Sequence, residues 1–232
     1  MVSEQTLDRL RKSTSDWISQ SQGEPSCLPC SLYNIVHEIS SRDVAPLEST
    51  FSFEDVSKYL GYNPITGTSW DSLDAAMRKM IRLSRTNLWS PHVEETVRST
   101  DGRTLCDKAS DERCSFPLVT LGGEYLRDVY GLELPDNPML WLSHTVVVLG
   151  CEGDDSIIYD PYAMSRGAEP VRVFPMDELK RYWSLANVPR GHAWFQRQGR
   201  VLEEYQGAER CLRDLAGRGS SNSTATRWIS RL

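Results

Sequence analysis

WISQSQGEPSCLPCSLYNIVH, residues 17–37, is the stretch on which the rest of the chain depends. It reads as a short extended segment, a polar loop and then a helix that opens near Cys27. Pro29 suits the first turn of that helix, where a missing backbone N–H costs nothing. Apolar residues recur after the loop at helical spacing, at Leu32, Ile35, Val36 and Ile39. Cys27 is therefore predicted to lie where a polar loop becomes a buried helix.

A cysteine at the start of a helix is well placed for nucleophilic chemistry. Unpaired backbone N–H groups point out of the first turn, and the helix dipole favours a negative charge there. Such surroundings lower the pKa of a thiol, and the thiolate is the nucleophile. Gln20 and Gln22 lie just upstream, where a side-chain amide is able to donate to a developing oxyanion. We prefer Gln20, which follows the extended residues 17–19, and keep Gln22 as the alternative.

Two predicted strands in the second half of the chain supply a base and a group that orients it. Residues 143–150, SHTVVVLG, form a β-branched apolar run that begins beside His144. After an acidic turn, residues 156–162, SIIYDPY, form a second strand that ends at Asp160. A hairpin of this length brings His144 and Asp160 side by side. The order Cys27, His144, Asp160 is that of a thiol hydrolase whose triad is assembled by the fold.

Taken together, these features resemble the double-glycine-leader (bacteriocin-processing) cysteine peptidases and their stand-alone relatives, within the papain-like superfamily. The matching parts are the glutamine before Cys27-Leu28-Pro29, His144 with the apolar strand after it, and Asp160-Pro161-Tyr162. Residues 174–183 and 192–195 match the late helix of the family, with its tryptophan, and its last strand. The resemblance covers roughly residues 17–198, and the middle third of this span is unmatched.

The resemblance implies an α+β, papain-like fold, in which an N-terminal helical half carrying the Cys27 helix packs on an antiparallel sheet carrying His144 and Asp160. It implies a cysteine peptidase that acts on a peptide or protein substrate, cleaves a peptide or isopeptide amide through an acyl-enzyme, and needs no cofactor or metal. Interception of the same acyl-enzyme by an amine would make the protein an acyltransferase. The family usually has glycine directly after the nucleophile, where this chain has Leu28. This departure supports a second hypothesis, a papain-like domain that binds a peptide or partner without cutting it.

Length and composition limit the other classes of function. The chain has 232 residues, enough for one well-cored domain. Its formal charge of −6 argues against a general nucleic-acid surface, and no apolar run approaches the roughly 20 residues of a membrane span. The first residues lack the apolar region of a signal peptide, which indicates a cytoplasmic protein. In that compartment the six cysteines are expected to be reduced.

We expect a single domain over residues 1–216, with its core at 17–198 and a disordered tail at 217–232. The tail contains the low-complexity sequence GRGSSNSTAT. Residues 201–215 predict a final amphipathic helix. Residues 84–121 are the least legible part of the chain, and we interpret them as an insertion in the helical half.

Cys27-x-x-Cys30 also suits half of a zinc site or a redox pair. A zinc site needs a second pair, and the seven residues between Cys106 and Cys114 are not knuckle spacing. Redox use remains open, since Cys30 lies one helical turn from Cys27 and is able to form a reversible protecting disulfide with it. The simplest interpretation makes Cys30 a small core residue. The other histidines are most simply packing or surface residues: His37, His92 and His192.

Overall fold

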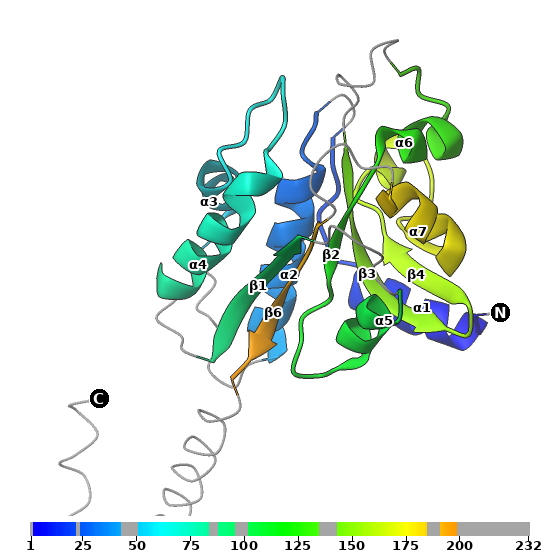
Figure 1. Ribbon diagram of the computed structural model, residues 1–232, viewed down its shortest axis with the longest axis horizontal. Helices are drawn as coiled ribbons and strands as arrows, with labels where there is room; N and C mark the ends of the chain where they lie inside the picture. The colour runs from blue at the N-terminus through cyan, green and yellow to red at the C-terminus, as the bar shows by residue number, and fades with distance from the viewer. Residues whose placement is uncertain are drawn as a thin grey trace, which may run out of the picture.

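The computed structural model describes residues 2–21, 24–42, 51–83, 88–95, 102–134, 143–184 and 191–198. Within these ranges, helices cover both faces of one six-stranded sheet whose strands all pair antiparallel, in the order β1-β6-β2-β3-β4-β5 (Figure 1). The strands are β1 (Trp89–Glu95), β2 (Leu118–Leu121), β3 (His144–Glu152), β4 (Asp155–Tyr159), β5 (Val171–Pro175) and β6 (Gly191–Arg197). The predicted α+β layout, with the cysteine on a helix packed against an antiparallel sheet that carries the histidine, is confirmed.

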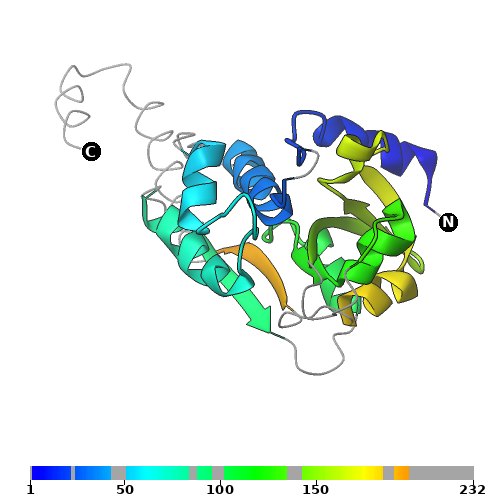
Figure 2. The ribbon, with the colours of Figure 1, turned by 90° about the horizontal axis from the view of Figure 1, so that it is seen from above.

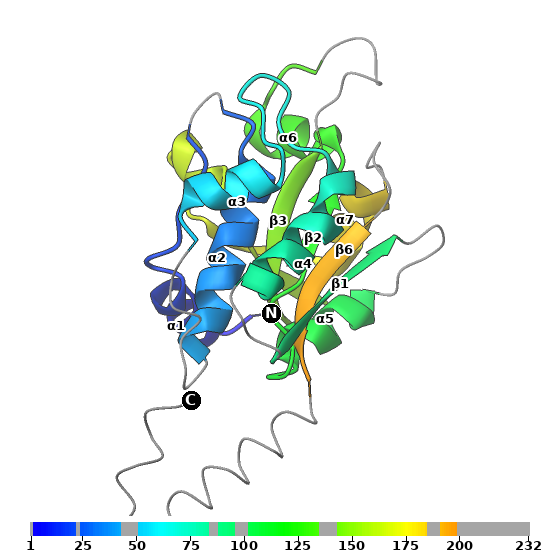
Figure 3. The same cartoon turned by 90° about the vertical axis from the view of Figure 1, so that its left-hand side faces the viewer.

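The helices fall into two groups, one on each face of the sheet (Figure 2). On one face lie α1 (Glu4–Ser13), α2 (Cys27–Arg42), α3 (Phe53–Tyr59), the short η1 (Trp70–Ser72) and α4 (Leu73–Leu83). Figure 3 shows α2, α3 and α4 in front of the sheet. On the other face lie α5 (Gly102–Ser110), α6 (Gly123–Tyr130) and α7 (Met176–Ser184). A second short helix, η3 (Ala163–Arg166), follows β4.

Alternation along the strands gives each face its own core, because successive side chains of a strand point to opposite faces. In β3, Val147 and Leu149 belong to the core with α2, whereas Val146 and Val148 belong to the core with α6 and α7. The unbroken β-branched run of β3 is therefore explained by burial on both sides. Of the two cores, the one beneath α2 holds Leu32, Ile35 and Ile39, as the helical spacing predicts.

Residues 84–121 differ from our expectation of an insertion in the helical half. Their described part supplies β1 and β2, and β2 lies inside the sheet between β6 and β3. The sequence hides both strands. β2 has only four residues, too few for a periodic signal, and β1 contains Pro91, which is tolerated because β1 is an edge strand.

The expectation that all cysteines are reduced is wrong for two of them. Cys106 on α5 and Cys151 at the end of β3 form a disulfide, with their Cα atoms 5.4 Å apart. The reason is packing, since α5 lies against β3 and brings the two side chains together. In the described part of the chain, Cys27, Cys30 and Cys114 are free thiols.

Several predictions concern residues outside the described ranges. These are the helix at 201–215, the tail at 217–232 and the alternative oxyanion donor Gln22. The single-domain boundary at 216 likewise stays a prediction. None of the helices within the described ranges combines the length and the apolar character needed to cross a bilayer.

Candidate active site

The structure brings Cys27, His144 and Asp160 together at one end of the sheet. Cys27 is the first residue of α2, His144 is the first residue of β3, and Asp160 directly follows β4. The Nε2 atom of His144 lies 2.7 Å from Oδ1 of Asp160. A carboxylate only accepts hydrogen bonds, so Nε2 carries the proton. Nδ1 is then the ring nitrogen left for the Cys27 thiol, with which His144 also forms a hydrogen bond.

Electrostatics favour a charged pair between Cys27 and His144. Burial raises the pKa of the Cys27 thiol, but the hydrogen bond and charge of His144 and the backbone N–H groups of Thr145 and Leu28 lower it below its ordinary value overall. Burial also disfavours an imidazolium, yet the Asp160 carboxylate and the Cys27 sulfur raise the pKa of His144 to about 10. Both shifts stabilise a thiolate beside an imidazolium.

Asp160 is completely buried and is bonded through both carboxyl oxygens. Oδ1 accepts from His144 and, at 2.9 Å, from the backbone N–H of Tyr162. Oδ2 accepts from the hydroxyls of Tyr125, at 2.5 Å, and Tyr130, at 2.6 Å. Burial opposes the negative charge, but the charge of His144 and these hydrogen bonds lower the pKa of Asp160 to about 2. The carboxyl group is therefore an anion at neutral pH.

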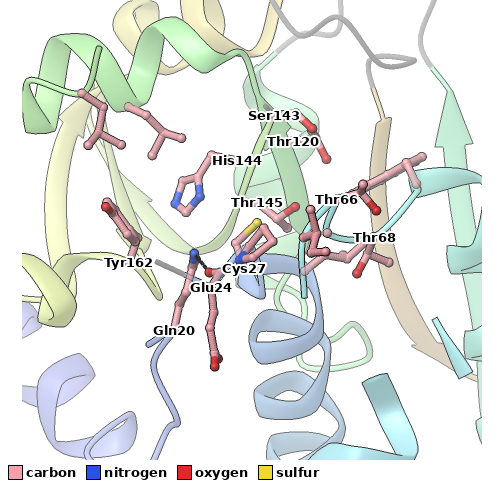
Figure 4. Close-up of a pocket in the computed structure, with 17 residues that line it drawn as sticks. Gln20, Glu24, Cys27, Thr66, Thr68, Thr120, Ser143, His144, Thr145 and Tyr162 are labelled. Carbon is pink, nitrogen blue, oxygen red and sulfur yellow. Dashed lines mark hydrogen bonds between the residues drawn. The ribbon is translucent and has the colours of Figure 1, made fainter. Parts of the chain in front are cut away.

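Gln20, the preferred oxyanion donor, is held beside the cysteine and histidine by backbone bonds. Its N–H donates to the Pro161 carbonyl at 2.8 Å. Ile18, two residues before Gln20, is held to α2 by the Asn34 side chain, which forms two hydrogen bonds of 2.9 Å with the Ile18 backbone. The Gln20 amide nitrogen donates to the Glu24 carbonyl, and Figure 4 shows this end of the side chain directed toward His144 and Cys27. An amide nitrogen carries two N–H groups, and the second is a candidate oxyanion donor.

A cleft of about 240 Å³ lies over these residues. Thr66 and Thr68 line one side of it and Tyr162 the other, with Cys27 and His144 between them (Figure 4). Two hydroxyls in its lining, those of Thr68 and Thr120, are buried and have no hydrogen-bond partner among the described residues. Apolar side chains complete the lining: Leu28, Ile65, Trp70, Leu126 and Leu132.

A tight turn over residues 63–67, here called the rim turn, carries the most exposed of these apolar side chains. Asn63 and Gly67 exchange backbone hydrogen bonds of 2.9 and 2.8 Å, and the Asn63 side chain accepts from the N–H of Ile65 at 2.8 Å. Gly67 has φ +78°, and a Cβ there would lie 3.2 Å from the Pro25 carbonyl oxygen. The turn presents Ile65, which is 84% exposed, at the edge of the cleft.

Leu28, the residue that distinguishes this chain from the family pattern, directs its side chain into the core. It is only 4% exposed and belongs to the core beneath α2. Its backbone N–H bonds the Cys27 sulfur. Its side chain also forms part of the cleft lining.

Cys30 has the surroundings of a core residue. It is 2% exposed, its thiol makes a weak bond of 3.8 Å to the Ser26 hydroxyl, and burial raises its pKa to about 12. Over the described ranges, no three His, Cys, Asp or Glu side chains gather as metal ligands. The rings of His92 and His192 both stack with Trp194, at centroid distances of 5.1 and 5.0 Å. His37 is half-exposed.

Sequence reasoning missed the residues that support the three site residues. Asn34 sits on the buried helix α2, and its only sign in the sequence is a polar residue among apolar ones. Tyr125 and Tyr130 lie 35 and 30 positions from Asp160, on a helix packed against the far face of the sheet. No spacing in the sequence indicates that approach.

The comparisons with known proteins gave solved structures only. No protein-family model matches the chain, and neither does any curated protein. One similar structure is a double glycine motif protease from an AMS/PCAT transporter, solved in complex with the leader peptide: 14% identity, 78% of this chain and 91% of that chain, TM-score 0.47. Another is the peptidase domain of Streptococcus ComA, a bi-functional ABC transporter involved in quorum sensing. The match has 15% identity and a TM-score of 0.44, and it covers 78% of this chain and 97% of that chain.

Proposed function

We propose that this protein is a cysteine-dependent hydrolase that cleaves a peptide or isopeptide amide bond. Cys27 acts as the nucleophile, His144 as the general base and acid, and Asp160 as the group that orients the imidazole. The observation that carries the proposal is the hydrogen-bonded series from the thiol through His144 to a buried, ionised Asp160, placed at a cleft.

In the first half of the reaction, His144 Nδ1 takes the thiol proton and the Cys27 sulfur attacks the carbonyl carbon. The C=O π bond opens, and the oxygen becomes an oxyanion. The second amide N–H of Gln20 and the backbone N–H of Cys27 donate to it. The C–N bond then breaks, the imidazolium gives its proton to the leaving amine, and a thioester remains on Cys27.

In the second half, His144 takes a proton from water, the resulting hydroxide attacks the thioester, and a carboxylic acid and the free thiol are released. An amine that replaces this water would give a new amide, which is the acyltransferase alternative. Running the reaction in ¹⁸O-water separates the two fates, because hydrolysis places the label in the product carboxyl group and aminolysis does not.

The cleft supports a peptide as the substrate. The hydroxyls of Thr66 and Ser143, which also line the cleft, suit the N–H and C=O groups of an extended backbone. The apolar side chains around them, Ile65 on the rim turn and Leu126 opposite, suit the apolar side chains of a peptide.

The non-catalytic alternative, a domain that binds a peptide without cutting it, was based on Leu28. Leu28 is only 4% exposed and packs in the core, which argues against a side chain that stands free over the thiol. The ionised surroundings of Cys27 also favour catalysis, because a mere binding site has no need of a thiolate.

The test is a digest of a proteome-derived peptide library, with new N-termini identified by mass spectrometry. We expect cleavage by the wild-type protein and none by Cys27→Ala, whose melting temperature should match the wild type. Cleavage by Cys27→Ala would remove the mechanism. Binding of library peptides by both proteins without cleavage would instead favour the binding-domain alternative.

A further inference from the structure

The buried carboxyl group of Asp160 has one oxygen that does not face His144. This atom, Oδ2, lies 2.5 Å from the hydroxyl of Tyr125 and 2.6 Å from that of Tyr130. A phenol has a single proton and a carboxylate has none, so each tyrosine donates to Asp160. Two short charge-assisted bonds therefore hold this oxygen in place.

Arg172 on β5 fixes the direction of one of these bonds. Its Nη1 atom donates to the Tyr130 hydroxyl oxygen at 2.9 Å. A guanidinium cannot accept a hydrogen bond, so the Tyr130 oxygen must accept from Arg172 and its proton must point to Asp160. Arg172 therefore donates to Tyr130 and Tyr130 donates to Asp160, whose carboxylate also accepts from His144.

Tyr125 contacts His144 as well as Asp160. The two rings are stacked, with their centroids 5.5 Å apart and an angle of 8° between their planes. Tyr125 is completely buried on α6, packed edge-on against Tyr182 at 5.4 Å. Its ring limits the tilt of the imidazole while its hydroxyl holds the carboxylate that the imidazole binds.

We propose that Tyr125 and Tyr130, the second held by Arg172, are positioning residues: by engaging Oδ2 of Asp160, they keep Oδ1 directed at His144. The inference rests on the proposed function and adds residues that act through Asp160 on the thiol–imidazole pair. Without one hydroxyl, the buried carboxylate turns to share its remaining donors, and its contact with His144 weakens. The imidazolium then loses stabilisation, and so does the thiolate that it pairs with.

The test compares Tyr125→Phe and Tyr130→Phe with Tyr182→Phe as the matched control. Tyr182 is a buried tyrosine whose hydroxyl bonds Asp128, not Asp160. The pH dependence of Cys27 alkylation gives the thiolate midpoint, and NMR of ¹⁵N-labelled imidazole gives the His144 midpoint. We expect the thiolate midpoint to rise and the imidazolium midpoint to fall by roughly one pH unit each, about tenfold in each equilibrium, and neither to move in Tyr182→Phe.

Arg172 offers a second, independent pair of variants. Arg172→Lys keeps a cationic donor, and it should leave both midpoints unchanged. Arg172→Gln supplies an oxygen that accepts the Tyr130 proton, and it should narrow the interval between the midpoints as Tyr130→Phe does. This pair keeps the inference testable if Tyr125→Phe does not fold.

Midpoints that stay in place or move apart in Tyr130→Phe would overturn the inference, and so would an equal change in Tyr182→Phe. Both readouts work without a substrate. If no peptide is cleaved by the wild type but the midpoints respond as expected, the proposed function fails and the positioning role stands. If peptides are cleaved and the midpoints do not respond, the positioning role fails alone.

Discussion

At the scale of single residues, the chemistry depends on how Cys27 and His144 share one proton. The pKa of Cys27 is lowered and that of His144 is raised to about 10, so the charged pair spans neutral pH. We expect iodoacetamide to alkylate Cys27 well below the pH at which an ordinary thiol reacts. Mapping by mass spectrometry provides internal controls, since burial raises the pKa of both Cys30 and Cys114.

Replacement of His144 should show how much of the lowered Cys27 pKa comes from the imidazole and how much from the helix start. In His144→Gln, the thiol loses its cationic partner, and the pH midpoint of Cys27 alkylation should move up toward that of an ordinary thiol. An unchanged midpoint would show that the helix start alone activates the cysteine.

Asp160 is predicted to act on turnover through the imidazole. In Asp160→Asn, the side chain can present an N–H to His144 in place of an acceptor, which favours the wrong tautomer. By analogy with other triads, turnover should fall by about 10⁴-fold. Steady-state kinetics on a cleaved library peptide measure this, and a rate close to that of the wild type would place the orienting group elsewhere.

The ion pair between Asp160 and His144 should make the stability of the fold depend on pH. The lowered pKa of Asp160 contributes stability that is fully present above the ordinary carboxyl pKa. This stability is lost as the pH falls toward the folded-state pKa of about 2. The raised pKa of His144, about 10, contributes stability that is present below the ordinary imidazole pKa and is lost as the pH rises toward 10. The contribution of the Asp160–His144 pair to the free energy of unfolding in urea should therefore be fully present between about pH 4 and 6.5. Asp160→Asn should weaken the decline on both sides, and an identical profile in this variant would contradict the assignment.

At the scale of elements, the rim turn is predicted to bind the substrate without supporting the fold. Ile65 is 84% exposed, so Ile65→Ser should change the free energy of unfolding by less than about 0.5 kcal/mol. If an apolar peptide side chain packs on Ile65, loss of that contact should raise KM roughly tenfold and leave kcat unchanged. Leu83→Ser is the matched control, because Leu83 is 47% exposed and is not part of the cleft lining. Equal effects of the two changes would exclude a specific role for the turn.

Elements with a long periodic pattern are the ones that the sequence could predict. The apolar spacing of α2 and the β-branched run of β3 can be recognised in the sequence. Cys27 and His144 are the first residues of these two elements. β1 escapes prediction because it is an edge strand that contains a proline, and β2 because it is short. Tyr125 and Tyr130 escape for another reason: only the packing of α6 over the sheet brings them to Asp160. Order along the chain therefore predicts the candidate reacting groups, and tertiary packing determines which residues support them.

At the scale of the whole molecule, the Cys106–Cys151 disulfide joins α5 to β3 across a separation of 45 residues. It was missed because the partners are remote in sequence and because a cytoplasmic location, still a prediction, argues for reduced thiols. Disulfides persist in oxidising compartments. The structure therefore predicts a bonded Cys106–Cys151 pair in the isolated protein, whereas a cytoplasmic location predicts two reduced thiols. The intact mass under non-reducing conditions distinguishes them, because a disulfide lowers it by two hydrogens.

Loss of the disulfide should destabilise the fold without stopping the proposed chemistry. Closing a loop of this length restricts the unfolded chain, so the double variant Cys106→Ser/Cys151→Ser should lose about 2–4 kcal/mol in the free energy of unfolding. Cys114→Ser is the control, since Cys114 is a buried free thiol and tests the cost of replacing a thiol by a hydroxyl. Guanidinium unfolding measures the stability, and alkylation of Cys27 reports on the site. The bond lies on β3 at the end opposite to His144, so the pH midpoint of Cys27 should not move. A shifted midpoint would mean that the disulfide also controls the geometry of the site.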